Sequence, residues 1–185
     1  MHSFFYENLV PHFGDNVQTF MMDTDSLMLS FTDMDPEDFE HANLHLFDTS
    51  DYPKNHRNYS DMNKKVAGKM KDEFSAEIVQ EFIGLKSKMY SIQLLNKTQK
   101  CTAKGVKTSY VSANLKHETY KSCLFDRTKL TGEFNTIRSK NHQLHTSLVR
   151  KDTLNCYDDK RFFLPNCVDS LAHGHKRIKE ENLMT

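Results

Sequence analysis

The sequence predicts an α+β protein, and three observations support this fold class. Apolar residues recur at helical spacing near the N-terminus, two short apolar runs flank a polar turn, and later segments alternate between apolar and polar residues. The chain has 185 residues, of which 37% are hydrophobic, with 13 Phe but only 6 Gly and 4 Pro. This composition is typical of one folded domain with at most a small appendage, and it argues against a fibrous or disordered chain.

Helices are predicted in three places. Near the N-terminus, Gly14 ends a helix whose apolar residues share one face, namely Phe5, Leu9 and Phe13. Asp35 caps a second helix, and Pro36 suits its first position; its inward-facing residues are expected to be Phe39, Ala42 and Phe47. A third helix is predicted near residues 114–125.

Strands are predicted from short apolar or alternating runs. The first two, at residues 17–22 and 26–31, are too short for separate helices and flank the polar turn 23–25, which predicts a β-hairpin with acids at its tip. Further strands are expected at residues 77–85, 87–95, 144–149 and 160–164. Residues 47–61 are interpreted as an irregular loop.

Charge is unevenly distributed, although the formal net charge is zero. Residues 1–62 carry twelve acids and two bases, whereas residues 63–185 carry 23 bases and 13 acids. An acidic half can hold a divalent metal and a basic half can follow a phosphate backbone, but solvated surfaces explain the asymmetry equally well. No run of about 18 apolar residues and no secretory signal is present, so we expect an intracellular protein without membrane contact.

The thiols and the closest histidine pair indicate no metal site. No two cysteines are close enough in sequence for a zinc-binding pair, so we expect reduced thiols in or near the core at Cys101, Cys123, Cys156 and Cys167. His173 and His175 lack a third ligand in sequence, which favours a structural or surface role.

Asp23 and Asp25 are the candidate catalytic residues. At the tip of a hairpin, two aspartates separated by one residue can direct both carboxylates into one small volume, and Mg²⁺ prefers such oxygen ligands together with substrate phosphates. Taken alone, the pair is more often part of an ordinary turn. A second pair with this spacing, Asp33 and Asp35, is interpreted as a loop and a helix cap.

The residues around these aspartates resemble a known family. MMDTDSLMLSF resembles the D-T-D-S motif of family B DNA polymerases, and GLKSKMYS resembles their K-x-Y motif, here Lys88, Met89 and Tyr90. Several further segments, in order, resemble the C-terminal part of the protein-primed polymerases of Polinton (Maverick) elements and related viruses: FDTSDYP, NKKVAGKMKDE, KCTAKGV, FNTIRSKNHQLHT, DDKRFFL and LAHGH. One departure is Met21, because family members often have an aromatic residue two positions before the first aspartate.

The resemblance implies a fold and a set of site residues. It implies an antiparallel palm-type sheet in residues 1–95, with the DTD hairpin and flanking helices, and a thumb-like basic region in residues 96–185. Asp25 would be the direct metal ligand and Asp23 its essential neighbour, while Thr24 and Ser26 would shape the turn. The complete active site would hold two Mg²⁺ ions, with Mn²⁺ as a substitute.

Contacts with DNA are also implied. Lys88 would lie near phosphate, and Tyr90 would pack or hydrogen-bond near the primer end. Five lysines are candidates for sequence-independent contacts with DNA phosphates, although each taken singly is more often an ordinary surface lysine: Lys100, Lys104, Lys107, Lys116 and Lys121.

The resemblance also implies partners and leaves three functions open. The family's other palm aspartate and its nucleotide-contacting helix do not fit into the 22 residues before Asp23, so we expect the isolated chain to be inactive without an upstream palm and exonuclease polypeptide. The other partners would be primer–template DNA, a deoxynucleoside triphosphate and a terminal protein primer. The protein would act in the nucleus or at a viral replication site. The alternatives are a non-catalytic DNA-binding remnant, or a structural protein in which DTDS is only a turn.

Overall fold

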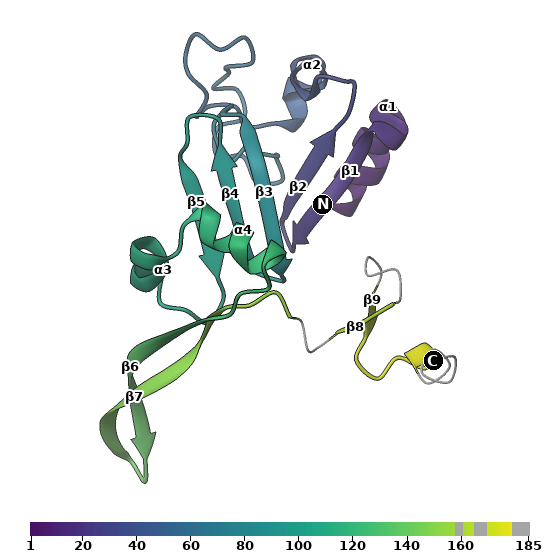
Figure 1. Ribbon diagram of the computed structural model, residues 1–185. Helices are drawn as coiled ribbons and strands as arrows, with labels where there is room; N and C mark the ends of the chain where they lie inside the picture. Colours follow the sequence, from purple (N-terminus) through teal and green to yellow (C-terminus); the bar gives the residue numbers. More distant parts are fainter. Residues whose placement is uncertain (158–160, 165–169, 179–185) are drawn as a thin grey trace. The chain divides into compact units, whose positions relative to one another are not determined.

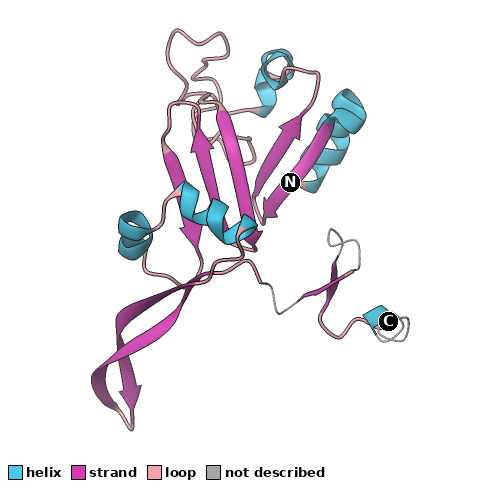
Figure 2. Cartoon of the chain, viewed as in Figure 1, coloured by secondary structure: helices cyan, strands magenta, loops and turns pink. Residues whose placement is uncertain are grey.

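A computed structural model describes residues 1–157, 161–164 and 170–178 of the chain. It is an α+β protein whose strands form small antiparallel sheets of two or three strands (Figure 1). Figure 2 separates the helices and strands from the long loops that connect them. In the described ranges, every helix falls short of the length and apolar run that crossing a membrane requires.

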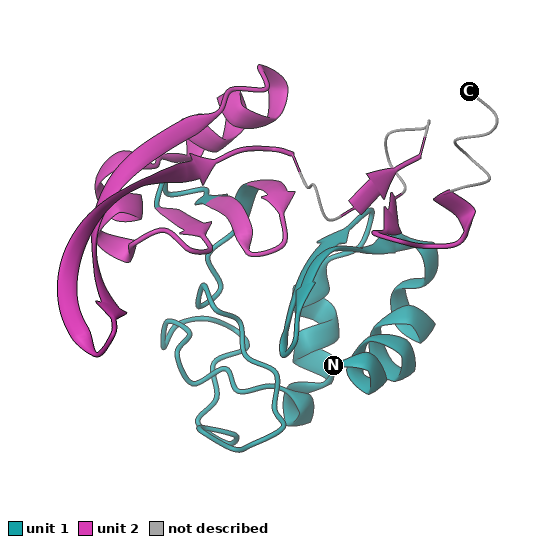
Figure 3. Ribbon diagram, turned by 90° about the horizontal axis from the view of Figure 1, so that it is seen from below, with its two compact units in different colours: residues 1–81, 93–98 teal, residues 82–92, 99–185 magenta. Residues whose placement is uncertain are grey.

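The chain divides into two compact units, coloured separately in Figure 3. Unit 1 comprises residues 1–81 and 93–98, and unit 2 comprises residues 82–92 and 99–185. Asp23 and Asp25 therefore belong to unit 1, whereas Lys88, Tyr90 and Lys104 belong to unit 2. The assignment of residues 1–95 to a palm and 96–185 to a thumb stays a prediction.

Unit 1 begins with the predicted N-terminal helix. It consists of a π-helical turn (η1, Phe4–Leu9), a short α-helix (α1, Val10–Phe13) and a 3₁₀ turn (η2, Gly14–Asn16). Leu9 and Phe13 are buried in a cluster with Val17 and Phe39, which confirms the apolar face expected from their spacing. Gly14 has a positive φ of 55° at the end of α1, a conformation that favours glycine.

The next two strands form the predicted β-hairpin. Strand β1 (Val17–Asp23) pairs antiparallel with β2 (Ser26–Phe31), and Asp23 faces Ser26 in the last pair before the turn. The register shifts between Thr19 and Met21, so Phe20 is the additional residue of a β-bulge.

Helix α2 (Pro36–Ala42) is shorter than the sequence predicts. The Asp35 carboxylate accepts a hydrogen bond from the Glu37 amide at 2.9 Å, which confirms the cap, and Phe39 is buried as expected. The expectation that Ala42 faces inward is wrong, because the helix ends at this exposed residue and a 3₁₀ turn follows (η3, Leu44–Leu46). Besides Phe39, the residue of α2 that is buried is the polar Glu40.

Residues 47–78 contain no helix or extended strand, which confirms and extends the loop predicted at 47–61. After it, β3 (Val79–Lys86), β4 (Met89–Leu94) and β5 (Gln99–Ala103) form a three-stranded sheet in that order. The first two strands match the prediction, whereas β5 was not predicted.

Two helices complete the core of unit 2. Helix α3 (Thr108–Asn114) was not predicted, and α4 (His117–Phe125) lies within the predicted range. The Tyr120 hydroxyl of α4 donates to the Thr102 carbonyl of β5 at 3.0 Å, and Tyr120 is fully buried. The buried apolar residues of this core come from strands, helices and the segments that follow them: Ile83, Leu85, Met89, Ala103, Val111, Leu115, Tyr120, Cys123, Leu154 and Cys156.

A long two-stranded hairpin projects from this part of unit 2 (Figure 1). It consists of β6 (Leu130–Lys140) and β7 (Gln143–Leu154), of which the sequence predicted only part of the second strand. The base of the hairpin packs closely, because a Cβ added at Gly132 would lie 2.9 Å from both Tyr110 and Thr153 side-chain atoms. Glycine at this position therefore lets the hairpin join the core.

The C-terminal part contains one more strand pair, β8 (Arg161–Phe163) with β9 (Ser170–Ala172). Strand β8 agrees with the strand predicted at 160–164, whose first residue, Lys160, lies outside the described residues. Three thiols are free as predicted, at Cys101, Cys123 and Cys156, and Cys167 lies outside the described residues. In the LAHGH segment, the His175 Nδ1 atom accepts a hydrogen bond from the Arg177 amide.

Candidate functional site

The turn between β1 and β2 is tight and strained. The Asp25 amide donates to the Asp23 carbonyl at 2.6 Å, so three residues reverse the chain around Thr24. Thr24 has a φ of +56°, a conformation in which a β-branched residue is an outlier. Strain of this kind persists only where the surrounding structure holds it, and it is concentrated at functional positions.

Both residues expected to shape this turn make contacts within it. The Thr24 hydroxyl donates to the Asp23 carboxylate at 3.4 Å, and the Ser26 hydroxyl donates to the Asp23 carbonyl at 3.3 Å. Asp23 is half-buried, whereas Thr24 and Asp25 are exposed. The tip therefore presents carboxylate oxygens to solvent, which suits a cation that keeps several of its waters.

The chemistry of these donors fits Mg²⁺, because Mg²⁺ is usually bound by one or two carboxylates together with substrate phosphates. Within the described ranges, no cluster of three or more His, Cys, Asp or Glu side chains is arranged to hold a metal. The second aspartate pair is built differently, because Asp33 lies in a loop with a φ of +57° and the Asp35 carboxylate caps α2.

Unit 2 brings two of the predicted DNA-contacting residues together. Lys88 lies in the two-residue turn between β3 and β4 with a φ of +58°, and its carbonyl accepts a hydrogen bond from the Lys104 amide at 3.0 Å. Both lysines are exposed. Tyr90 lies on β4, is half-buried, and packs with its ring centroid 6.0 Å from that of Phe82. The backbones of Lys88 and Lys104 thus meet at one corner of the sheet, where both side chains are exposed.

Two of the other candidate lysines use their ammonium groups within the protein. Lys107 donates to the Asn135 carbonyl at 2.6 Å, and Lys116 donates to the Ser112 carbonyl at 3.2 Å. Lys107 thereby ties α3 to β6. For these two residues a structural role is observed, and a phosphate contact stays a prediction.

The β6–β7 hairpin is a candidate nucleic-acid surface that the sequence reasoning missed. Residues 134–151 contain no acid, but they contain four Arg or Lys residues and two histidines: Arg138, Lys140, Arg150, Lys151, His142 and His145. This acid-free run was visible in the sequence. That these residues form one surface follows only from β6, which was not predicted and which pairs with β7 through the whole run.

The strand register separates the two faces of this hairpin. Arg138 pairs with His145, and Lys140 pairs with Gln143, so the cations of the outer half lie on one face. Three apolar side chains lie on the other face and are 64–77% exposed: Ile137, Leu144 and Leu148. A two-stranded ribbon of this kind has the dimensions to enter the major groove of a DNA duplex.

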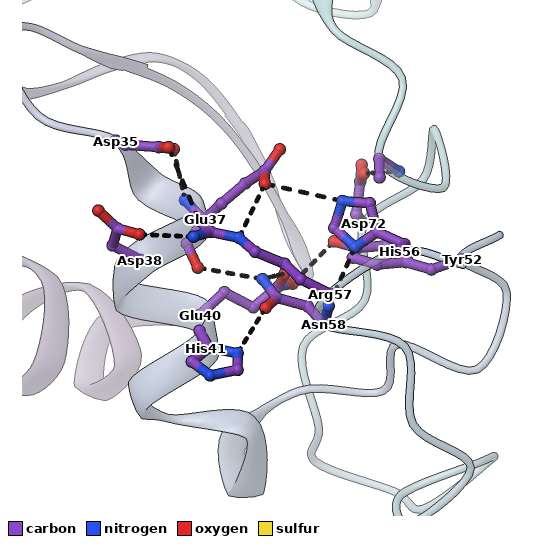
Figure 4. A network of polar contacts seen from close by, with 11 residues as sticks. Asp35, Glu37, Asp38, Glu40, His41, Tyr52, His56, Arg57, Asn58 and Asp72 are labelled. Atoms are coloured by element: carbon purple, nitrogen blue, oxygen red, sulfur yellow. Dashed lines mark hydrogen bonds and ion pairs between the residues drawn. The ribbon is translucent and has the colours of Figure 1, made fainter. Parts of the chain in front are cut away.

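In unit 1, a polar network joins α2 to the loop that follows it (Figure 4). The buried Glu40 carboxylate accepts hydrogen bonds from the Tyr52 hydroxyl at 2.7 Å and from the Asn58 amide at 2.8 Å. Burial, and then the hydrogen bond to Glu40, raises the pKa of Tyr52 above its ordinary value. Around this centre, Arg57 forms an ion pair with Asp38 at 2.8 Å.

Asp48 organises the next part of this loop. It is buried, and its carboxylate accepts hydrogen bonds from the backbone amides of Lys65 at 3.0 Å and Ser50 at 3.1 Å. These surroundings lower the pKa of Asp48 from 3.8 to about 2. The Ser50 side chain has the largest effect on this pKa, followed by the Lys65 amide, and the Ser50 amide and the Lys71 ammonium contribute less. Burial acts in the opposite direction and raises the pKa.

This pKa predicts acid sensitivity of unit 1. Because the pKa of Asp48 is lowered from 3.8 to about 2 on folding, its stabilising effect is complete above about pH 4 and is lost as the pH falls towards 2. The loss corresponds to about 2 kcal/mol of unfolding free energy. Unfolding followed from pH 6 to 2 is expected to show this decrease in the wild type and not in Asp48→Asn. The matched variant Asp61→Asn, at an exposed site, is expected to keep the wild-type pH dependence, and an unchanged profile in Asp48→Asn contradicts this assignment.

The chain has no significant match among models of protein families, curated proteins or solved structures.

Proposed function

We propose that the chain is the C-terminal part of a protein-primed family B DNA polymerase that performs templated nucleotidyl transfer once an upstream palm polypeptide completes its active site. The observation that carries this proposal is the hairpin tip, where Asp23 and Asp25 flank a strained turn and Asp25 is exposed. The palm-type arrangement of residues 1–95 and the thumb role of residues 96–185 belong to the same proposal.

Asp25 and Asp23 would hold Mg²⁺ through their carboxylate oxygens. Bound there, Mg²⁺ would supply Lewis-acid chemistry for the primer 3′-hydroxyl and the leaving pyrophosphate. The protein's own contribution is positional: the contacts of Thr24 and Ser26 with Asp23 fix the turn, so the two acids approach the nucleotide from one rigid strand end.

Two features of unit 2 support contact with primer–template DNA. The corner formed by Lys88 and Lys104 presents two cations from neighbouring turns, and Tyr90 lies two residues beyond Lys88. The β6–β7 hairpin adds a positively charged face without acids. Phosphate neutralisation by such cations does not depend on base sequence, which is what copying an arbitrary template requires.

Primer extension tests the proposal. The chain alone is expected to extend no primer, whereas the chain supplied with a polypeptide that carries the upstream palm motif is expected to extend one in Mg²⁺ or Mn²⁺. In that mixture Asp25→Asn should lower the rate at least about 100-fold, because a metal ligand in the transition state is lost. The matched variant Asp33→Asn should retain the wild-type rate. Extension by the isolated chain, or full activity of Asp25→Asn, contradicts the proposal.

A non-catalytic DNA-binding remnant is the second candidate function. The β6–β7 hairpin favours it, because its positive face needs no metal and no further chain to contact phosphate. Two results together would support this function over the first. Duplex binding would be unchanged in Asp23→Asn/Asp25→Asn, and no primer would be extended after the palm polypeptide is supplied.

A further inference from the structure

The outer half of the β6–β7 hairpin, residues 135–148, has one face without a charged side chain. Residues directly opposite each other in an antiparallel pair lie on the same face, and the face alternates along each strand, so the register assigns every side chain. The uncharged face consists of six residues: Asn135, Ile137, Ser139, Leu144, Thr146 and Leu148. Each of its pairs combines one aliphatic side chain with one small hydrogen-bonding side chain, and the aliphatic ones are 64–77% exposed.

The register that separates the two faces is held at the end of the hairpin. Asn141 and His142 form the two-residue turn with φ of 51° and 62°, a left-handed geometry that matches the twist of the two strands. On the face opposite the uncharged one, the hydroxyls of Thr136 and Ser147 hydrogen-bond across the strands at 3.2 Å. A slip by one residue would exchange the two faces, so these contacts fix which side chains the hairpin presents together.

The opposite face, here the cationic face, carries Arg138 and Lys140, and both side chains are exposed. Their charges lie at the ends of long, flexible stems, which can bend around the edge of a narrow two-stranded ribbon to a phosphate at the margin of a groove. The side chains of the uncharged face are short, so they contact a ligand only when their own face lies directly against it. The difference in reach therefore favours the uncharged face as the one that lies on the floor of a groove.

The chemistry of the uncharged face matches the base edges of the major groove. Thymine presents a methyl group there, which aliphatic side chains contact, and all four bases present donors or acceptors that Asn, Ser and Thr side chains can hydrogen-bond. Every pair of this face offers both kinds of contact, as Ile137 and Thr146 do in its middle.

A second copy of the chain is a poorer fit to this face. The outer half has six residue pairs along its ladder, so the face measures roughly 20 Å by 10 Å, or about 200 Å², whereas a stable interface buries about 800 Å² on each partner. Residues 134–151 contain no acid, so two hairpins that face each other would also bring like charges together. The same absence of acids complements the phosphates of DNA.

We propose that the uncharged face lies against the base edges in the major groove of duplex DNA, where Ile137, Leu144 and Leu148 pack on thymine methyl groups. Arg138 and Lys140 then point away from the floor of the groove and bind the phosphates at its margins. This inference rests on the DNA-binding role proposed above for the hairpin, and it adds the orientation of the hairpin in the groove. Packing on methyl groups discriminates weakly, so the hairpin binds any duplex and prefers those that contain thymine.

Duplexes that differ only in thymine methyl groups test the orientation with the full wild-type chain. A duplex in which deoxyuridine replaces every thymine is expected to bind roughly fivefold more weakly than the thymine duplex, because methyl burial is lost. The slope of log affinity against log salt should stay the same, since no phosphate contact changes. Fluorescence anisotropy measures both quantities. Equal affinity for the two duplexes overturns the orientation, whereas binding to neither duplex overturns the proposed DNA contact as well.

Variants assign the effect to the uncharged face. Ile137→Ser/Leu144→Ser is expected to bind the thymine duplex roughly 10-fold more weakly than the wild type does, with an unchanged salt slope. This variant should no longer distinguish the thymine duplex from the deoxyuridine duplex. The matched variant Val66→Ser/Ile78→Ser removes two exposed aliphatic side chains from unit 1 and should bind both duplexes like the wild type.

Three further results would overturn the orientation. The first is wild-type affinity in Ile137→Ser/Leu144→Ser together with a loss of affinity in Arg138→Gln/Lys140→Gln, because the hairpin then binds DNA through its cationic face alone. The second is a dimer in analytical ultracentrifugation that only Ile137→Ser/Leu144→Ser dissociates. The third is binding to vesicles of phosphatidylcholine and phosphatidylserine that the same variant abolishes while duplex binding is unaffected.

Discussion

Replacing Arg138 and Lys140 by glutamine is expected to weaken duplex DNA binding roughly 50-fold at 0.1 M salt. Each phosphate contact contributes about 0.9 to the slope of log affinity against log salt, so two lost contacts give this factor and lower the slope by about 2. Both side chains are exposed on the outer half of the β6–β7 hairpin and lie on the same face. The fold should therefore tolerate the change, and the loss should be the same for any base sequence.

The matched control removes the same charge elsewhere. Lys54 and Lys65 are exposed lysines of unit 1 to which the proposal assigns no phosphate contact, so Lys54→Gln/Lys65→Gln is expected to change the affinity less than about threefold. Affinity is measured by fluorescence anisotropy over several salt concentrations. Equal losses in the two double variants would show that net charge alone is responsible, and the hairpin would then have no special role.

Glu40→Ala is expected to lower the stability of unit 1 by about 3 kcal/mol, a larger effect than the loss of the Asp48 charge. The substitution leaves the Tyr52 hydroxyl and the Asn58 amide buried without the carboxylate that accepts their hydrogen bonds. It also releases the loop that carries both residues from α2. Hydrogen exchange of the amides in residues 36–58 measures the effect locally.

Two variants make this result interpretable. Glu37→Ala, at a 42% exposed carboxylate on the same helix, is expected to cost less than about 1 kcal/mol, since exposed ion pairs contribute little. Glu40→Gln keeps one oxygen acceptor and should lie between the two alanine variants. If Glu40→Ala is no more destabilising than Glu37→Ala, the network in Figure 4 does not hold the loop.

Local signals in the sequence were sufficient for the elements around the candidate metal site. The hairpin was predictable because two short apolar runs flank a polar turn, and the start of α2 was predictable because Asp35 precedes Pro36. The burial of Glu40 was not predictable. Its partners, Tyr52 and Asn58, lie in an irregular loop whose path depends on tertiary contacts, and no sequence period connects them to α2.

The proposed DNA-contacting surface was predictable only in part. Lys88 and Tyr90 were found through a motif, but the contact between Lys88 and Lys104 arises because two turns of one sheet meet. The acid-free run 134–151 is visible in the sequence, whereas the separation of its cations from Ile137 and Leu144 requires the register of β6 with β7. The strand β6 itself was missed because polar residues and Gly132 weaken its apolar pattern.

Paramagnetic broadening by Mn²⁺ in the NMR spectrum of the full chain tests the Asp23–Asp25 metal site most directly. The amide signals of residues 23–26 are expected to broaden first, at Mn²⁺ concentrations that leave the signals of residues 33–35 sharp, and Asp25→Asn should remove this selectivity. The second aspartate pair serves as an internal control, because it has the same spacing but caps a helix. Broadening that begins at residues 33–35, or that is unchanged in Asp25→Asn, would contradict a divalent-metal site at the hairpin tip.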